Sequence, residues 1–131
     1  MNKSVMIVGV GGQGTLLASR ILGDAMMDQG YDVKVSEVHG MSQRGGSVVT
    51  YVRYGDKVYS PIIETGEADV VLAFEQLEAA RFLPYLKVGG TVVTSTQKID
   101  PMPVVTGEKE YPSGLLEEMG ERASAFWRWT P

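Results

Sequence analysis

The fold of this chain is decided close to its start, by the stretch Val5-Met6-Ile7-Val8-Gly9-Val10-Gly11-Gly12-Gln13-Gly14-Thr15. An apolar run leads directly into closely spaced glycines and then into a helical pattern, which predicts a strand, a tight turn and a helix. The glycines match the spacing G-x-G-x-x-G, which allows a sharp reversal of the chain and tight packing of the helix on the strand. We call residues 9–14 the glycine turn.

The glycine turn is a candidate anion site. The first N–H groups of a helix have no partner within the helix and lie at the positive end of its dipole, so a phosphate or carboxylate binds there readily. The candidate ligand residues are Gly9, Gly11, Gly12, Gln13 and Gly14, with Gln13 placed to cap the helix or to touch the ligand. The alternative is that the glycines serve close packing alone.

Length and composition limit the possible classes of protein. A chain of 131 residues with 44% hydrophobic residues makes one ordinary domain. The net charge of −4, with acidic and basic residues interspersed, disfavours nucleic acid as a partner. No apolar run reaches the length of a membrane span and no signal peptide precedes the first strand, so we expect a cytoplasmic protein with no membrane contact. The chain has no cysteine and one histidine, which excludes cysteine-ligated clusters and multi-histidine metal sites within it.

The rest of the chain alternates between strand and helix patterns. This order predicts an α/β domain, Rossmann-like, with three layers, a mostly parallel sheet and an edge β-hairpin. The strand over 32–37 is expected to lie parallel to the first strand, joined to it by a right-handed crossover. The other expected elements are a helix over 15–29 that packs through Leu17, Ile21, Leu22 and Met26 and ends at Gly30, a hairpin of 47–54 with 57–60, a strand over 69–74, a helix over 75–83, a strand over 91–95, a short strand over 104–106, and a helix over 114–119 capped by Ser113, while 121–131 fits no pattern.

A second glycine-flanked segment, Glu37-Val38-His39-Gly40-Met41-Ser42-Gln43-Arg44-Gly45-Gly46, follows the strand over 32–37. Ligands of such sheets bind beyond the carboxyl ends of the strands, so this loop and the glycine turn are expected to face one cleft. His39 is a candidate general acid or base, or a residue that only hydrogen-bonds its surroundings. Arg44 has a planar fork that suits carboxylate or phosphate, and the glycines after it let the backbone approach the same anion. The candidate binding residues of this loop are Glu37, His39, Ser42, Arg44, Gly45 and Gly46.

Glu37 also supports an alternative function. It stands about where a dinucleotide-binding domain keeps the acid that binds a ribose hydroxyl, which indicates an NAD(P)-dependent dehydrogenase domain. The hairpin expected after Glu37 speaks against this interpretation, because a dinucleotide-binding fold would continue with a crossover helix. A third interpretation is a non-catalytic nucleotide-binding assembly module.

Three motifs, residues 9–14, 36–48 and 83–90, together resemble the gamma-type chain of the 2-oxoacid:ferredoxin oxidoreductases. The second motif most resembles the beta subunit of the indolepyruvate enzymes, which act on aryl 2-oxoacids. The resemblance runs from about Met6 to Pro112. It is lost after about Met119, so we divide the chain into a gamma-type domain over 1–120 and an atypical tail over 121–131 that suggests a truncated or frame-shifted gene.

The resemblance implies a small subunit that holds no cofactor or metal alone and has no catalytic residue of its own. It would assemble with a large subunit that carries thiamine diphosphate and iron–sulfur clusters. The complex would decarboxylate a 2-oxoacid such as indolepyruvate to an acyl-coenzyme A and pass electrons to ferredoxin. The glycine turn and the loop over 39–46 would lie at the cleft toward the catalytic subunit and coenzyme A.

Overall fold

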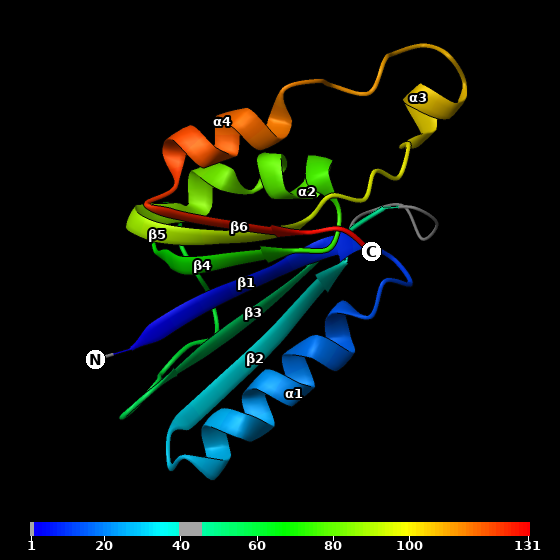
Figure 1. Ribbon diagram of the computed structural model, residues 1–131. Coiled ribbons are helices and arrows are strands. Elements are labelled where there is room, and N and C mark those ends of the chain that lie inside the picture. Colours follow the sequence, from blue (N-terminus) through cyan, green and yellow to red (C-terminus); the bar gives the residue numbers. More distant parts are fainter. Residues whose placement is uncertain (1, 40–45) are drawn as a thin grey trace.

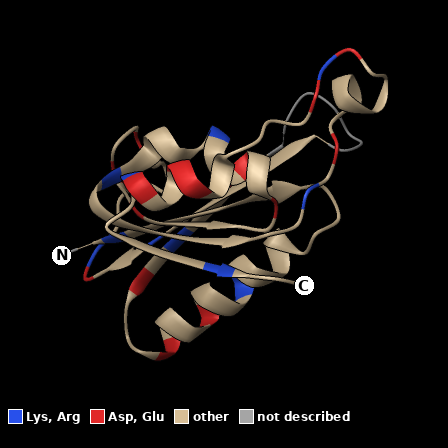
Figure 2. Cartoon of the chain, turned by 45° about the horizontal axis from the view of Figure 1, so that its top comes forward, with Lys and Arg blue, Asp and Glu red and all other residues tan. Residues whose placement is uncertain are grey.

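The computed structural model describes residues 2–39 and 46–131, apart from the His39 side chain. The described part forms one sheet with helices on both faces (Figure 1). Acidic and basic residues are interspersed over the helices and the strand ends (Figure 2). The elements are β1 (Lys3–Val10), α1 (Thr15–Asp28), β2 (Asp32–His39), β3 (Ser47–Gly55), β4 (Ala68–Ala73), α2 (Gln76–Arg81), a 3₁₀ turn η1 (Leu83–Tyr85), β5 (Leu86–Ser95), α3 (Met102–Val105), α4 (Leu115–Arg122) and β6 (Ala125–Trp129).

The sheet has the strand order β2-β3-β1-β4-β5-β6. Strand β3 runs antiparallel to both of its neighbours, and the remaining strands are parallel to one another. Helices α2 and α4 cover one face of the sheet, and α1 covers part of the other. The predicted class, a three-layer Rossmann-like α/β domain with a mostly parallel sheet, is confirmed.

The predicted orientation of β2 is confirmed, since it runs parallel to β1, with β3 inserted between the two strands. The predicted hairpin of 47–54 with 57–60 is wrong, because residues 57–60 form no strand and the antiparallel pair at the edge is β2 with β3. The Val58 N–H donates to the Asp32 carboxylate at 2.8 Å, so a side chain takes the place of a strand partner. Val52 and Thr50 of β3 are fully buried, in keeping with the interior position of this strand.

Helix α1 meets the sheet through small residues. Thr15, Ser19 and Gly23 are its buried positions, and a Cβ on Gly23 would lie 3.6 Å from Val33. The larger side chains that were expected to pack do so only in part, since Leu17 and Ile21 are each 63% exposed. Small residues at the buried positions let the helix axis lie close to the strands. The long side chains of the helix then point toward solvent. The predicted end of the helix is confirmed, with Gly30 in the left-handed region at φ 91°.

The C-terminal third departs most from expectation. Residues 102–105 form the short helix α3 where a strand over 104–106 was predicted; prolines at its start favour a helical first turn. Helix α4 begins after Gly114, which is left-handed at φ 74°, and no side chain, Ser113 included, caps it. Residues 125–129, for which the sequence showed no pattern, form β6 parallel to β5. Strand β4 and helix α2 occur within two residues of their predicted bounds, whereas β5 begins at Leu86, five residues before its predicted start.

Candidate functional site

The glycine turn lies at the carboxyl end of β1, and its glycines are needed for different reasons. Gly12 and Gly14 have φ of 88° and 87°, a region that side chains other than glycine rarely adopt. At Gly9 the obstacle is space, since a Cβ there would lie 2.9 Å from Gln13 Oε1 and 3.0 Å from Thr15 Cγ2. Gly11 has neither constraint. The packing explanation therefore holds for Gly9, while Gly12 and Gly14 shape the turn.

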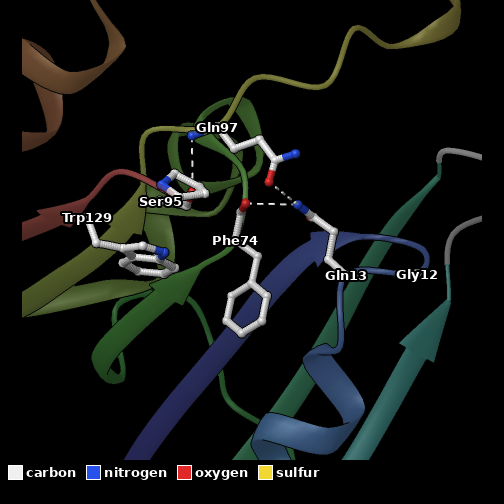
Figure 3. Close-up of a pocket in the computed structure, with 7 residues that line it drawn as sticks. Gly12, Gln13, Phe74, Ser95, Gln97 and Trp129 are labelled. Atoms are coloured by element: carbon white, nitrogen blue, oxygen red, sulfur yellow. Dashed lines mark hydrogen bonds between the residues drawn. The ribbon is translucent and has the colours of Figure 1, made fainter.

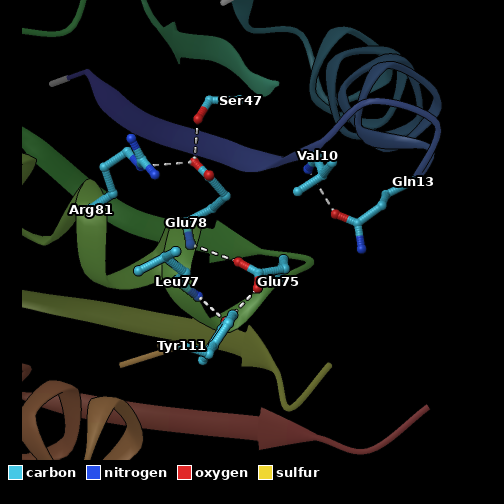
Figure 4. Close-up of polar contacts among 8 residues, drawn as sticks. All are labelled: Val10, Gln13, Ser47, Glu75, Leu77, Glu78, Arg81 and Tyr111. Atoms are coloured by element: carbon cyan, nitrogen blue, oxygen red, sulfur yellow. Dashed lines mark hydrogen bonds and ion pairs between the residues drawn. The ribbon is translucent and has the colours of Figure 1, made fainter. Parts of the chain in front are cut away.

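The Gln13 side chain connects the glycine turn to the ends of neighbouring strands by hydrogen bonds. Its Oε1 accepts the Val10 N–H at 2.8 Å, and its Nε2 donates to the Phe74 carbonyl at 2.9 Å and to Gln97 Oε1 at 3.4 Å (Figures 3 and 4). It does not cap the helix, because Gly14 is the N-cap residue and no side chain accepts from the first turn. Of the two roles expected for Gln13, the helix cap is not observed, whereas the ligand contact stays a prediction; in the structure Gln13 also holds the turn.

The N-terminus of α1 has the properties of an anion site. It carries no side-chain cap and no acidic residue in its first turn. The Ala18 N–H is bonded to the Gly14 carbonyl, which leaves the N–H groups of the preceding turn without a partner inside the helix. The positive end of a 14-residue helix thus points out of the carboxyl edge of the sheet.

A cavity of about 520 Å³ opens beside the turn (Figure 3). This volume is within the range of small-molecule sites. Phe74 and Trp129 make an edge-to-face ring contact on one side, with centroids 5.9 Å apart. None of the described side chains that line the cavity is charged. The lining residues are Gly12, Gln13, Phe74, Ser95, Gln97, Trp129 and Pro131.

Among the described residues, the glycine turn contacts the second loop at the stem of that loop. The Gly11 N–H donates to the Gly46 carbonyl at 3.3 Å. The backbone of His39 pairs with Val48, which pairs with Gly9, so the end of β2 is level with the turn. Ser42, Arg44 and Gly45 lie outside the described residues.

Glu37 lies one strand farther from β1 than the ribose-binding acid of a dinucleotide-binding fold does. It pairs with Thr50 of β3, which pairs with Ile7 of β1, so a complete strand separates it from β1. In a dinucleotide-binding fold the ribose-binding acid ends the strand adjacent to β1. The topology therefore disfavours the dehydrogenase interpretation.

Five lining residues were not predicted from the sequence, namely Phe74, Ser95, Gln97, Trp129 and Pro131. Phe74 and Ser95 stand at the carboxyl ends of the strands predicted over 69–74 and 91–95. Since the carboxyl ends of parallel strands meet at one edge, this signal was available. No signal pointed to Trp129, because β6 itself was not predicted.

The buried carboxylate of Glu75 holds the segments near the carboxyl edge of the sheet together through hydrogen bonds. Glu75 is 1% exposed and accepts hydrogen bonds from the Glu78 N–H at 2.8 Å, the Ile99 N–H at 3.0 Å and the Tyr111 hydroxyl (Figure 4). The Tyr111 oxygen in turn accepts the Leu77 N–H at 2.9 Å. Burial, and then the hydrogen bond and charge of Glu75, raise the pKa of Tyr111 well above its usual value. The hydroxyl therefore stays protonated, and both ends of the segment over 99–111 are held against α2.

Glu78 links α2 to the start of β3. Its Oε2 accepts the Ser47 hydroxyl at 2.7 Å and lies 3.5 Å from Arg81 Nε. Burial raises the pKa of Glu78, and the Ser47 hydrogen bond and the Arg81 charge offset this only in part. Because Ser47 directly follows the second loop, the contact fixes the stem of that loop.

Within residues 2–39 and 46–131, no three His, Asp or Glu residues are grouped closely enough to hold a metal ion. None of the helices in the same ranges combines the length and apolar character of a membrane span.

The fold and the cavity define a Rossmann-like domain with a ligand-sized hollow beside its glycine turn. Residues 4–125 match the family model described as pyruvate ferredoxin/flavodoxin oxidoreductase. The indolepyruvate oxidoreductase subunit IorB of Pyrococcus horikoshii is 53% identical over 116 residues, which cover 88% of this chain and 56% of that protein. This chain therefore belongs to the pyruvate ferredoxin/flavodoxin oxidoreductase family, as its three motifs predicted. It spans little more than half the length of that relative.

Solved structures with the same fold agree with this assignment. The gamma subunit of a keto/oxoacid ferredoxin oxidoreductase from Geobacter sulfurreducens has a TM-score of 0.62 at 22% identity, and the match covers 99% of this chain and 60% of that chain. A 2-oxoglutarate:ferredoxin oxidoreductase from Magnetococcus marinus, with 2-oxoglutarate, coenzyme A and succinyl-coenzyme A bound, has a TM-score of 0.65 at 19% identity over 98% of this chain and 19% of that chain. At these identities, the likeness concerns the fold.

Proposed function

We propose that this chain acts as the small subunit of a cytoplasmic indolepyruvate:ferredoxin oxidoreductase, or of a close relative that uses another aryl 2-oxoacid. The observation that carries the proposal is the 53% identity to the Pyrococcus horikoshii subunit over 88% of this chain. The composition agrees with such a role, since the chain has no cysteine to ligate an iron–sulfur cluster. Thiamine diphosphate and the clusters would then be held by a larger partner subunit.

The complex would convert a 2-oxoacid and coenzyme A to an acyl-coenzyme A and carbon dioxide, with two electrons passed to ferredoxin. The part of this chain would be to bind and orient coenzyme A at the subunit cleft. Coenzyme A carries phosphates, and the uncapped N-terminus of α1 offers N–H donors for an anion. The cavity beside it adds the rings of Phe74 and Trp129 for an apolar or planar part of the ligand.

Three features support placing coenzyme A at this edge. The cavity has room for part of such a ligand, its described lining carries no acidic side chain to repel phosphate, and Gln13 holds the turn in one conformation. The Magnetococcus enzyme of the same fold binds coenzyme A. The loop residues Ser42, Arg44 and Gly45, with His39 and Gly46, would complete the site from the second loop, where the Arg44 fork suits a phosphate.

Reconstitution with the large subunit tests the proposed function. The chain is co-purified from its source with its partner, and reduction of a viologen dye is measured with indolepyruvate and coenzyme A. We expect turnover by the complex and none by either subunit alone. Turnover by the isolated chain with a nicotinamide cofactor, or full activity of the large subunit without this chain, would refute the proposal.

A further inference from the structure

At the carboxyl edge, the glycine turn lies between two other segments of the chain. Strand β1 runs between β3 and β4 in the sheet. Because β3 is antiparallel to β1 and β4 is parallel to it, the start of β3 and the end of β4 flank the end of β1. The turn therefore has the stem of the second loop, residues 46–47, on one side. On the other side are residues 74–78, which run from the end of β4 into the first turn of α2 and which we call the β4–α2 junction.

The glycine turn is hydrogen-bonded to both of these segments. Gln13 Nε2 donates to the Phe74 carbonyl at the start of the junction, at 2.9 Å (Figure 3). On the opposite side, the Gly11 N–H donates to the Gly46 carbonyl in the loop stem, at 3.3 Å. The Gln13 side chain also accepts the Val10 N–H at 2.8 Å, so the protection of this amide reports where Gln13 lies. The position of the turn thus depends on the junction and on the loop stem together.

A third hydrogen bond joins the junction to the loop stem and closes a ring of contacts around the turn. The Ser47 hydroxyl donates to Glu78 Oε2 at 2.7 Å (Figure 4). Ser47 follows Gly46 directly, and Glu78 is the last residue of the junction. Neither Ser47 nor Glu78 lines the cavity. While their hydrogen bond holds, the loop stem, the glycine turn and the junction cannot move independently.

The buried carboxylate of Glu78 is a costly way to make this link. Its side chain is 7% exposed, and burial raises the pKa of Glu78. The nearby cation, Arg81, has its Nε 3.5 Å away and is itself 52% exposed, so its charge offsets the burial only in part. A neutral acceptor would bind the Ser47 hydroxyl at a lower desolvation cost. A charged acceptor gives a shorter and stronger hydrogen bond, which fixes the loop stem more tightly.

We propose that Glu78 is a positioning residue of the candidate ligand site, which through Ser47 couples the second loop's stem to the glycine turn. Glu78 and Ser47 touch no ligand, and they act on the turn through Gly46 and Gly11 on one side and through the junction on the other. A ligand that fixes the turn would also fix the loop stem, and the reverse, because coupling between two sites is reciprocal. The coupling itself does not depend on the proposed function, whereas its effect on coenzyme A rests on that function.

Amide hydrogen exchange of the chain tests the coupling without any ligand, after circular dichroism verifies that each variant is folded. Ser47→Ala removes the donor and Glu78→Leu removes the acceptor. We expect each to speed exchange of the Val10 and Gly11 amides several-fold and to leave the amides of β4 and β5 unchanged. The double variant should exchange no faster than either single variant, since the two residues act through one hydrogen bond. Ser47→Thr keeps the hydroxyl and should restore slow exchange, and the matched control is Ser36→Ala, at a half-buried serine of β2 outside the ring of contacts.

Binding in the assembled complex measures the consequence for the ligand. Calorimetry should show an affinity for coenzyme A at least about threefold weaker in Ser47→Ala, and unchanged in Ser36→Ala. Turnover at saturating coenzyme A should stay at the unaltered rate, because the proposal places neither Ser47 nor Glu78 at the reacting atoms. A general loss of folded complex would instead lower turnover and leave the affinity of the remaining complex unchanged.

Two results would overturn the inference. One is exchange of the Val10 and Gly11 amides at the same rate in Ser47→Ala and in the unaltered chain. The other is equal affinity for coenzyme A in the Ser47→Ala complex and the unaltered complex, in which case the ligand site stands and Glu78 has no positioning role. If exchange responds as expected but the unaltered complex does not bind coenzyme A, the coupling is supported and the proposed function fails.

Discussion

A hollow lies at each edge of the sheet, and the side chains that line the two hollows differ in charge. At the amino edge, Lys3 and Lys87 flank Asp69, whose second oxygen accepts the Ser4 N–H at 2.8 Å. At the carboxyl edge, the described lining has no charged side chain, and the positive end of α1 opens toward the cavity. The carboxylate of Asp69 offsets part of the positive charge at the amino edge, whereas the carboxyl edge has N–H donors in the first turn of α1 that have no partner inside the helix.

An anion site need not be a cluster of lysines, because the N–H groups at a helix N-terminus also bind anions. Burial by itself would raise the pKa of Asp69, but the hydrogen bonds from Lys87 and the Ser4 N–H, with the charges of both lysines, outweigh it and hold this pKa below its usual value. The Asp69 carboxylate therefore remains charged and forms ion pairs with Lys3 and Lys87. We accordingly propose the carboxyl edge as the ligand site.

The largest expected effect comes from filling the space at Gly9. In Gly9→Ala, the new Cβ would force Gln13 away and weaken its bonds to Val10 and Phe74, so we expect a loss of about 2–3 kcal/mol in unfolding free energy. Gly11→Ala is the matched control, since a Cβ there meets nothing within 4 Å. Urea denaturation of both variants measures the difference, and equal stabilities would show that the turn tolerates displacement of Gln13.

A smaller effect is expected at the amino edge. Asp69→Asn removes the charge that Lys3 and Lys87 share but keeps an acceptor for Ser4, so it should cost about 1–2 kcal/mol. Because the folded pKa of Asp69 lies below the unfolded value of about 4, its contribution is complete above that pH and lost as the pH falls through the folded pKa. Stability measured from pH 6 to pH 2 should therefore fall less in the variant. Parallel curves would show that Asp69 carries no such linkage.

The elements that a local sequence pattern defines could be predicted from the sequence. The strand, glycine turn and helix over residues 5–28 are contiguous, and the apolar run over 69–74 defines β4 by itself. The position of β3 between β2 and β1 depends on pairing between segments far apart in the sequence, which periodicity does not encode. The packing of α1 through Thr15, Ser19 and Gly23 was missed because larger residues beside them suggested a different face.

The candidate site was predicted in part for the same reason. The glycine turn was found because its residues are adjacent, and Gly12 and Gln13 do line the cavity. Phe74 and Ser95 lie at the cavity because three parallel strands end at the same edge of the sheet. That they lie close together can be predicted only once the strand order is known. Trp129 was missed because the short β6 leaves Trp127, Arg128 and Trp129 exposed, without the alternation of a half-buried strand.

The most direct test of the ligand site compares two glycines with the same backbone constraint. Gly12 and Gly30 have φ of 88° and 91°, and a Cβ at either meets nothing within 4 Å, but only Gly12 lines the cavity. Calorimetry of coenzyme A binding to the assembled complex would compare Gly12→Ala and Gly30→Ala with the unaltered chain. We expect Gly12→Ala to weaken binding at least about fivefold, roughly 1 kcal/mol, and Gly30→Ala to leave it unchanged. Unchanged affinity in Gly12→Ala, or an equal loss in both variants, would contradict a ligand site at the glycine turn.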